Sequence, residues 1–245
     1  MKNAASSLML SIALMLGAGA VLAQSDAWTL KEGQHPQYVL ADSGQRKIHL
    51  LLFLPKGYTE RKWPLLVFLH SGIAGGNDLK LLDIPGTPPR NVATQPDFPF
   101  IVASPQQSFE STKWNSADIA YLVDELMNRL PIDASRIYLT GASRGGSGVW
   151  SIAADHPQRF AALAPVSSKP DPEFVCQLKG VPVWAFHNKG DFVIDPKHVQ
   201  LGAERLRACG GTVELTIYSR DGHNAWSDAY ANSDLYKWLL SHSRK

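Results

Sequence analysis

Residues 138–146, with the sequence YLTGASRGG, decide the fold of this chain. A β-rich run stops at the pattern G-x-S-x-G, and a helix-compatible run that reaches Ala154 follows at once. This strand–turn–helix context makes the pattern a nucleophile elbow, in which a strained turn lifts a serine hydroxyl above the edge of a sheet. Gly141 and Gly145 fit because the turn leaves no room for side chains two residues either side of Ser143. A chance match would rarely have this context.

Outward from the elbow, apolar strands alternate with helices. Strands are expected at residues 48–54, 64–70, 100–103, 137–140, 160–166, 181–187 and 212–218. Helices are expected at residues 117–130, capped by Asn115 or Ser116, and at 148–154, 196–209 and 227–241, whereas residues 83–98 are expected to form a long surface loop. This alternation predicts an α/β fold with one doubly wound, mainly parallel sheet and no large lid, with its functional loops at the carboxyl ends of the strands.

A serine alcohol needs a base to accept its proton, and the base needs an acid to orient it. In this fold the chain order is serine, acid, histidine. Of the later histidines, His156 and His198 fall on helices and His242 lies in the C-terminal tail, whereas His187 precedes the best acid. His223 follows a tight turn directly after the last strand and is therefore the expected base.

The expected acid is Asp191, which lies just past the strand that ends at His187. Asp195 is a rival, but it precedes Pro196, and this pair is typical of a helix cap. Asp171, in a Pro-Asp-Pro run after an earlier strand, is a weaker rival.

The tetrahedral intermediate of acyl transfer needs two N–H donors for its oxyanion. One is expected from the backbone of Arg144, and the other from the loop after the strand that ends at His70. Within that loop Gly72 is favoured over Ser71 as the second donor. The alternative is that the glycines of the loop only form a flexible turn and donate to no oxyanion. Trp114 and Trp226 lie in loops near the expected site, so they are predicted either to line the substrate pocket or to pack in the core.

The N-terminal residues 1–23 have the features of a secretory signal peptide. Lys2 is followed by a nearly apolar run from Leu8 to Leu22, which is short for a membrane span, and small residues precede a cut after Ala23. The alternative is an uncleaved N-terminal anchor. The prediction is a single catalytic domain over residues 24–245 in a secreted or periplasmic protein, with no membrane span after cleavage.

The charge of the chain limits the kinds of partner to expect, and its cysteines indicate whether it contains a disulfide. The formal net charge is only +2, so nothing favours nucleic acid or an anionic membrane surface as a partner. Cys176 and Cys209 are the two cysteines, and an even number in an exported chain favours a disulfide over two separate thiols. Pairing them would place the bridge at the end of the sheet away from the chemistry.

Several further motifs resemble those of a known group. They are residues 54–58 (LPKGY), 64–70 (PLLVFLH), 132–146, 181–187 (VPVWAFH), Gly190-Asp191, 222–226 (GHNAW) and 235–240 (LYKWLL). In this order they resemble the α/β-hydrolase superfamily. Within it, the chain is similar to secreted carboxylesterases of the polyhydroxybutyrate-depolymerase and feruloyl-esterase-like type, which are related to prolyl oligopeptidase. The resemblance implies Ser143, Asp191 and His223 as nucleophile, acid and base.

The chain departs from that resemblance at two positions. The group usually has His-Gly after the third strand, where this chain has His70-Ser71, and it often has Met after the nucleophile, where this chain has Arg144. The first difference alters the expected oxyanion loop. The Arg144 side chain could favour anionic substrate groups, although packing of its aliphatic stem is the simpler interpretation.

These observations predict a serine esterase that acts through an acyl-enzyme and needs no metal or organic cofactor. A serine peptidase of prolyl-oligopeptidase type and a hydrolase-fold binding protein without turnover are alternatives. A metal-dependent hydrolase using His70, His187, Asp191 and His223 is a further one, but no pair among them has the spacing of zinc ligands. The sequence leaves open whether the natural ester is a polyester, an acylated polysaccharide or a small molecule.

Overall fold

A single eight-stranded sheet runs through the molecule. The structure is a computed structural model that describes residues 28, 30–41 and 46–244, so the predicted signal peptide lies outside the described residues. The strand order is β1-β2-β4-β3-β5-β6-β7-β8. The strands are β1 (Gly33–Ala41), β2 (Arg46–Leu54), β3 (Trp63–Leu69), β4 (Ile101–Gln106), β5 (Ile132–Ala142), β6 (Ala162–Val166), β7 (Val183–Gly190) and β8 (Val213–Asp221).

Most of the sheet is parallel. Strands β4, β3, β5, β6, β7 and β8 pair in parallel, and β2 runs antiparallel to both of its neighbours, β1 and β4. The carboxyl ends of β3, β5, β7 and β8 therefore meet at one edge of the sheet, where ligands bind in open α/β sheets. The predicted doubly wound, mainly parallel fold is confirmed.

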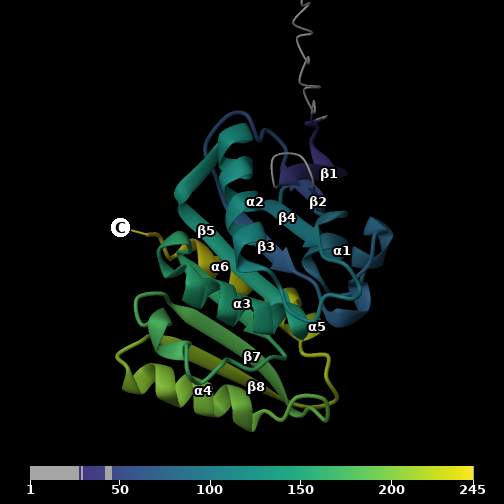
Figure 1. The fold of residues 1–245 in the computed structure, drawn as a ribbon. Coiled ribbons are helices and arrows are strands. Elements are labelled where there is room, and N and C mark those ends of the chain that lie inside the picture. The colour runs from purple at the N-terminus through teal and green to yellow at the C-terminus, as the bar shows by residue number, and fades with distance from the viewer. Residues whose placement is uncertain (1–27, 29, 42–45, 245) are drawn as a thin grey trace, which may run out of the picture.

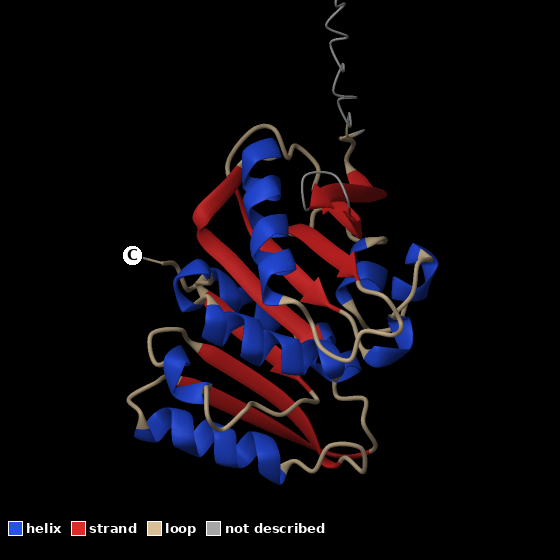
Figure 2. Cartoon of the chain, in the orientation of Figure 1, coloured by secondary structure: helices blue, strands red, loops and turns tan. Residues whose placement is uncertain are grey.

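Helices cover both faces of the sheet (Figures 1 and 2). One face carries α2 (Ser116–Arg129), α3 (Arg144–Asp155) and α4 (Lys197–Ala208), and the other carries α1 (Pro88–Val92), α5 (Trp226–Ala231) and α6 (Ser233–Leu240). The packing of strand β3 on both of its faces explains why its sequence is apolar throughout. Leu65 and Val67 pack into the first core and Leu66 and Phe68 into the second, as in a strand buried on both faces.

Helix α2 begins and ends where its sequence indicates. The Asn115 side chain accepts hydrogen bonds from the N–H groups of Ala117 and Asp118, which caps the first turn. Apolar residues at helical spacing, among them Ile119 and Leu126, are buried against the sheet. In the part of the chain that the structure describes, no helix combines the length and the apolar character that a membrane crossing requires.

The structure corrects three expectations. Residues 83–98 are not wholly loop, because Thr87 precedes Pro88 and Pro89 at the start of the short helix α1. The expected helix at 227–241 is divided into α5 and α6 at Asn232, whose extended backbone breaks the helix and whose side chain caps Asp234 N–H. Strand β1 was not expected, since it is a partly exposed edge strand without a clear apolar alternation.

The predicted disulfide joins Cys176 to Cys209. Cys176 lies in the short 3₁₀ helix η5 (Val175–Leu178), and Cys209 lies at the C-terminal end of α4. Because α4 leads from the carboxyl end of β7 back to the start of β8, the bridge lies at the edge of the sheet opposite the functional loops.

Candidate active site

Ser143 occupies the turn between β5 and α3 in an unusual backbone conformation. Its φ is 55° and its ψ is −116°, a backbone conformation that residues other than glycine rarely adopt. A Cβ atom at Gly145 would overlap the carbonyl oxygen of Leu69 at the end of β3, and one at Gly141 would lie 2.6 Å from the carbonyl carbon of Gly145. The two glycines therefore allow the turn to fit against β3, as the sequence predicts.

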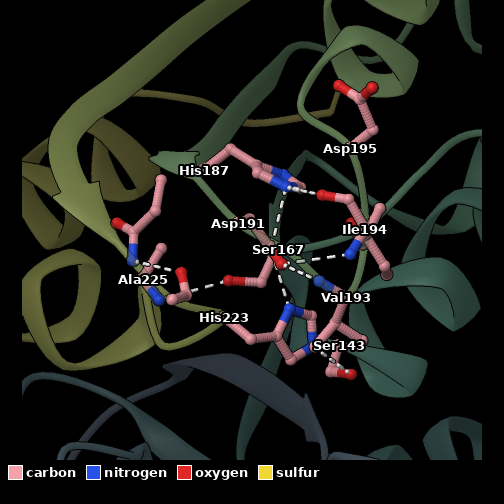
Figure 3. A network of polar contacts seen from close by, with 12 residues as sticks. Ser143, Ser167, His187, Asp191, Val193, Ile194, Asp195, His223 and Ala225 are labelled. Atoms are coloured by element: carbon pink, nitrogen blue, oxygen red, sulfur yellow. Dashed lines mark hydrogen bonds and ion pairs between the residues drawn. The ribbon is translucent and has the colours of Figure 1, made fainter.

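His223 connects the serine to a carboxylate (Figure 3). It follows the end of β8 by two residues, and its Nε2 lies 2.7 Å from Ser143 Oγ. Its Nδ1 lies 2.7 Å from Oδ2 of Asp191. A carboxylate only accepts hydrogen bonds, so the proton lies on Nδ1 and Nε2 is free to accept the serine O–H. Three side chains from three separate loops thus form one hydrogen-bonded chain.

Asp191, the first residue after β7, is buried, and both of its carboxylate oxygens accept hydrogen bonds. Its Oδ1 accepts the N–H groups of Val193 and Ile194 at 2.9 and 3.0 Å, in addition to the His223 bond on Oδ2. Burial alone would raise the pKa of this carboxyl, but the bonds from Ile194, His223 and Val193 together hold it below its usual value. Asp191 is therefore an anion at neutral pH.

A second histidine, His187, which the sequence does not predict as the base, contacts the same carboxylate. His187 Nε2 is 3.0 Å from Asp191 Oδ2 and 2.9 Å from the Ile194 carbonyl oxygen, so this nitrogen carries a proton and donates to both. The ring is completely buried, which lowers its pKa and keeps it neutral. Its position at the end of β7 was visible in the sequence, but nothing there indicated that it contacts Asp191.

The two rival acids have other roles. The Asp195 carboxylate accepts the Lys197 N–H at 2.9 Å at the start of α4, which is the predicted capping interaction. The Asp171 carboxylate accepts the Glu173 N–H at 2.9 Å in the loop after β6. Neither is among the residues hydrogen-bonded to His223, whose carboxylate partner is Asp191.

The two predicted oxyanion donors occupy equivalent positions. Gly72 is the first residue of the 3₁₀ helix η2 (Gly72–Ala74), and Arg144 is the first residue of α3. The first N–H groups of a helix have no acceptor within it, so both can donate to a ligand. The bond from His70 Nδ1 to the Ser71 carbonyl, at 2.7 Å, fixes the peptide unit that carries the Gly72 N–H.

His70 is held on both ring nitrogens. Its Nε2 accepts the Gln107 N–H at 3.1 Å, and its ring makes an edge contact with Trp114 at 4.8 Å between centroids. Burial lowers the pKa of His70 to about 4. The ring therefore stays neutral and joins the Gly72 loop to the loop that follows β4.

The Arg144 side chain does more than pack its stem. Its guanidinium donates to the Ser111 carbonyl at 2.6 Å and to the Gly72 carbonyl at 3.0 Å, so it ties together the two loops on this side of Ser143. Both acceptors are neutral. Desolvation lowers the pKa of Arg144.

The two tryptophans differ in position. Trp114 is mostly buried and borders a cavity of about 640 Å³ that also contacts Arg144 and Ser147 of α3. Trp226 begins α5 and lies edge-on to the His223 ring at 5.7 Å. Both therefore lie beside the candidate site, and Trp114 also belongs to the core on that face.

The four residues of the metal hypothesis do not form one group. His187, Asp191 and His223 are hydrogen-bonded together, whereas His70 bonds to Ser71 and Gln107 in a different loop. Within the described ranges, no group of three or more His, Cys, Asp or Glu side chains has an arrangement suited to holding a metal ion.

Comparison with known proteins supports this fold. The prolyl oligopeptidase family profile matches residues 107–177, which contain Ser143. An acetylxylan esterase of Emericella nidulans is 36% identical over 77 residues, which are 26% of this chain and 25% of that protein. A solved structure of a thermostable esterase is 27% identical with a TM-score of 0.74, and the match covers 86% of this chain and 63% of that one.

More distant structures share the fold alone. A ferulic acid esterase is 16% identical with a TM-score of 0.63, covering 86% of this chain and 97% of that one. An acylaminoacyl peptidase of Pyrococcus horikoshii is 14% identical with a TM-score of 0.66, covering 88% of this chain and 43% of that one. The chain spans a quarter of the acetylxylan esterase and less than two thirds of the thermostable esterase.

Proposed function

We propose that this chain, a member of the α/β-hydrolase superfamily, is an exported serine hydrolase that cleaves carboxylic ester bonds through an acyl-enzyme. The observation that carries the proposal is the His223 ring, which lies 2.7 Å from Ser143 Oγ and 2.7 Å from the Asp191 carboxylate. A nucleophile, a base and an orienting acid in hydrogen-bond contact are the requirements for acyl transfer by serine.

The first half of the proposed reaction forms the acyl-enzyme. His223 Nε2 takes the proton of Ser143 as its oxygen attacks the ester carbonyl carbon. The Asp191 carboxylate stabilises the positive charge that develops on the imidazole, and the N–H groups of Arg144 and Gly72 hold the oxyanion. When the carbon–oxygen bond of the ester breaks, His223 returns the proton to the departing alcohol.

The second half releases the acid. Water gives a proton to His223 and attacks the acyl carbon, and Ser143 Oγ then leaves as the proton moves back to it. The strained backbone of Ser143 supports this role, because such strain persists where the surrounding structure enforces it and is often found at active sites. The chemistry needs only protein groups and water, and Trp226, which lies edge-on to the His223 ring, is proposed to contact the substrate.

Ester cleavage is favoured by the relatives with higher identity. The acetylxylan esterase and the thermostable esterase, at 36% and 27% identity, are both esterases. The prolyl oligopeptidase profile makes peptide cleavage the second candidate. 4-Nitroanilides of short peptides, assayed beside 4-nitrophenyl esters, separate the two. Turnover of anilides at a rate comparable to that of esters would favour the peptidase.

The direct test compares the purified protein with Ser143→Ala on 4-nitrophenyl acetate and butyrate. We expect the substitution to lower kcat by about 10⁴-fold or more. Labelling with a fluorophosphonate should modify Ser143 alone, as read by mass spectrometry, and Ser241→Ala, at the end of α6, should behave as the unmodified protein does. Equal turnover by the protein and Ser143→Ala would refute the assignment and leave a binding role.

Export is part of the proposal. The disulfide between Cys176 and Cys209 is consistent with an oxidising compartment, and the signal-peptide features of residues 1–23 point the same way. N-terminal sequencing of the protein recovered from the periplasm or medium should begin at Gln24. The catalytic domain would then comprise residues 24–245.

A further inference from the structure

A large cavity bordered by Arg144, the residue that follows Ser143, offers more room than a short acyl group requires. Its volume of about 640 Å³ lies within the range of sites for drug-sized ligands, roughly 300–1,000 Å³. The start of α3, the loop before α2, the loop after β6 and helix α4 all contribute to its walls. An acetyl group would leave most of this space empty. The part of the substrate that fills it is therefore comparable in size to a sugar or an aromatic acid.

The charges around this cavity are predominantly positive. Lys113, Arg144 and Lys169 line it against a single carboxylate, that of Asp171, and His198 adds a titratable group. The Asp171 carboxylate already accepts the Glu173 N–H. The ion pairs found among the described residues involve none of the three cations.

Arg144 is the cation with a fixed position. Its guanidinium is bonded to the Gly72 and Ser111 carbonyls and belongs to the residue that follows the nucleophile. Neutral carbonyl partners orient this group without neutralising it. A partly desolvated charge without a counter-charge is costly, and an anion bound close to it would offset that cost. Lys113 in the loop before α2 and Lys169 in the loop after β6, which are exposed, add to the same field.

We infer that the ester substrate carries a carboxylate, and that this carboxylate lies in the cavity while the ester carbonyl lies at Ser143. Half-esters of dicarboxylic acids belong to this class, as do acidic sugars and hydroxybenzoic acids that are acylated on a hydroxyl group and keep a free carboxylate. Trp114 and Leu201 supply an apolar wall for the carbon skeleton between the two groups. This inference rests on the proposed function and specifies the substrate class of the same site.

Matched esters test the inference. Mono-4-nitrophenyl adipate and 4-nitrophenyl hexanoate place a carboxylate or a methyl group at the end of the acyl chain. 4-Acetoxybenzoate and 4-acetoxybenzamide make the same comparison on the alcohol side. We expect kcat/KM for the carboxylate member of at least one pair to be about ten-fold higher at low salt, with the advantage falling as sodium chloride is raised.

Substitutions locate the effect. Lys113→Gln and Lys169→Gln should each lower the ratio of kcat/KM between carboxylate and neutral ester by about three- to five-fold. Lys179→Gln removes an exposed lysine after η5 that does not line the cavity, so that ratio should not change. Because all values are ratios measured on one protein sample, a partly unfolded variant does not distort them.

The outcomes separate the two levels of the proposal. Neutral esters cleaved in a Ser143-dependent way, without any carboxylate preference in either pair, would overturn this inference and leave the esterase proposal standing. A preference that survives both lysine substitutions and also Arg144→Gln, which keeps the backbone N–H, would overturn it as well, since the charge would then act from elsewhere. No cleavage of any ester, together with no fluorophosphonate labelling of Ser143, would remove both proposals.

Discussion

The serine side of the site is held mainly by backbone, whereas the histidine side is held mainly by side chains. Ser143 sits in a turn whose glycines pack directly against the Leu69 carbonyl at the end of β3. His223 and Asp191 instead meet through side-chain hydrogen bonds between loops that follow different strands. A backbone contact has no room to adjust, whereas a hydrogen bond can be removed without disturbing packing. Substitutions that disturb the packing of the serine turn should therefore mainly lower the free energy of unfolding. Substitutions of the hydrogen-bonded side chains on the histidine side should mainly lower kcat.

On the histidine side, the largest expected effect is that of Asp191→Asn on turnover. The asparagine oxygen can still accept the Val193 and Ile194 N–H groups, so the fold should survive. The amide cannot stabilise a charged His223 and favours the wrong tautomer. We expect ester kcat to fall by about 10⁴-fold, or about 5 kcal/mol of barrier.

The matched control for that variant is Asp195→Asn, which changes the rival acid at the start of α4. Asparagine also caps helices well, so both stability and kcat should remain close to those of the unmodified protein. A loss of turnover in Asp195→Asn as large as that in Asp191→Asn would contradict the assignment of the acid.

Gly145→Ala tests the serine side. The added methyl group would overlap the Leu69 carbonyl oxygen, and both groups belong to fixed backbone. We expect the free energy of unfolding to fall by about 3–5 kcal/mol in urea denaturation followed by tryptophan fluorescence. Gly180→Ala provides the control, because a Cβ atom there meets nothing within 4 Å. If both variants unfold at the same urea concentration, the serine side is not limited by backbone contact.

The serine side should also be sensitive to acid because of His70. With its pKa at about 4 in the folded protein, against an ordinary value of 6.5, the unfolded state binds the proton more readily. The contribution of His70 to the free energy of unfolding is then fully present above pH 6.5. It falls by about 3 kcal/mol as the pH drops to about 4 and changes little below that. Urea denaturation between pH 8 and pH 4 measures this slope.

His70→Gln should make that pH dependence shallower by removing one of the groups that titrate, while buried His187 remains. Its stability at pH 8 should be lower than that of the unmodified protein, since the bond to the Ser71 carbonyl is altered. His198→Gln, which changes an exposed histidine on α4, should keep the full slope. An unchanged slope in His70→Gln would show that the acid sensitivity originates elsewhere.

The same contrast explains what could be predicted from the sequence. The serine turn is a local structure, so its strand, glycines and helix are adjacent in the chain and were predicted correctly. The parallel sheet followed from apolar strands such as β3, which are buried on both faces. Strand β1 and the break at Asn232 were missed because they depend on an edge pairing and on one side-chain cap, which leave little trace in hydrophobic periodicity.

The histidine side depends on contacts between distant loops, which the sequence defines less completely. Chain order and strand ends were enough to select Asp191 and His223 as candidates that the structure brings together. They did not reveal that the guanidinium of Arg144 bonds to the Gly72 loop, or that His187 shares a carboxylate oxygen with His223. Such contacts depend on side-chain direction after folding, which residue type and spacing do not determine.

His187 gives the smallest effect expected within the triad region and the sharpest test of the contrast, because it is a buried side chain that contacts the site through Asp191. His187→Leu removes one donor from the carboxylate and should lower kcat by about 10- to 100-fold with little change in KM. With one donor fewer, Asp191 should hold positive charge on His223 more strongly and move the acid limb of the kcat/KM profile to higher pH. His187→Gln retains an N–H donor and should recover most of kcat. A structural role alone would lower stability in both variants without moving that limb, and the histidine side would then depend on packing as the serine side does.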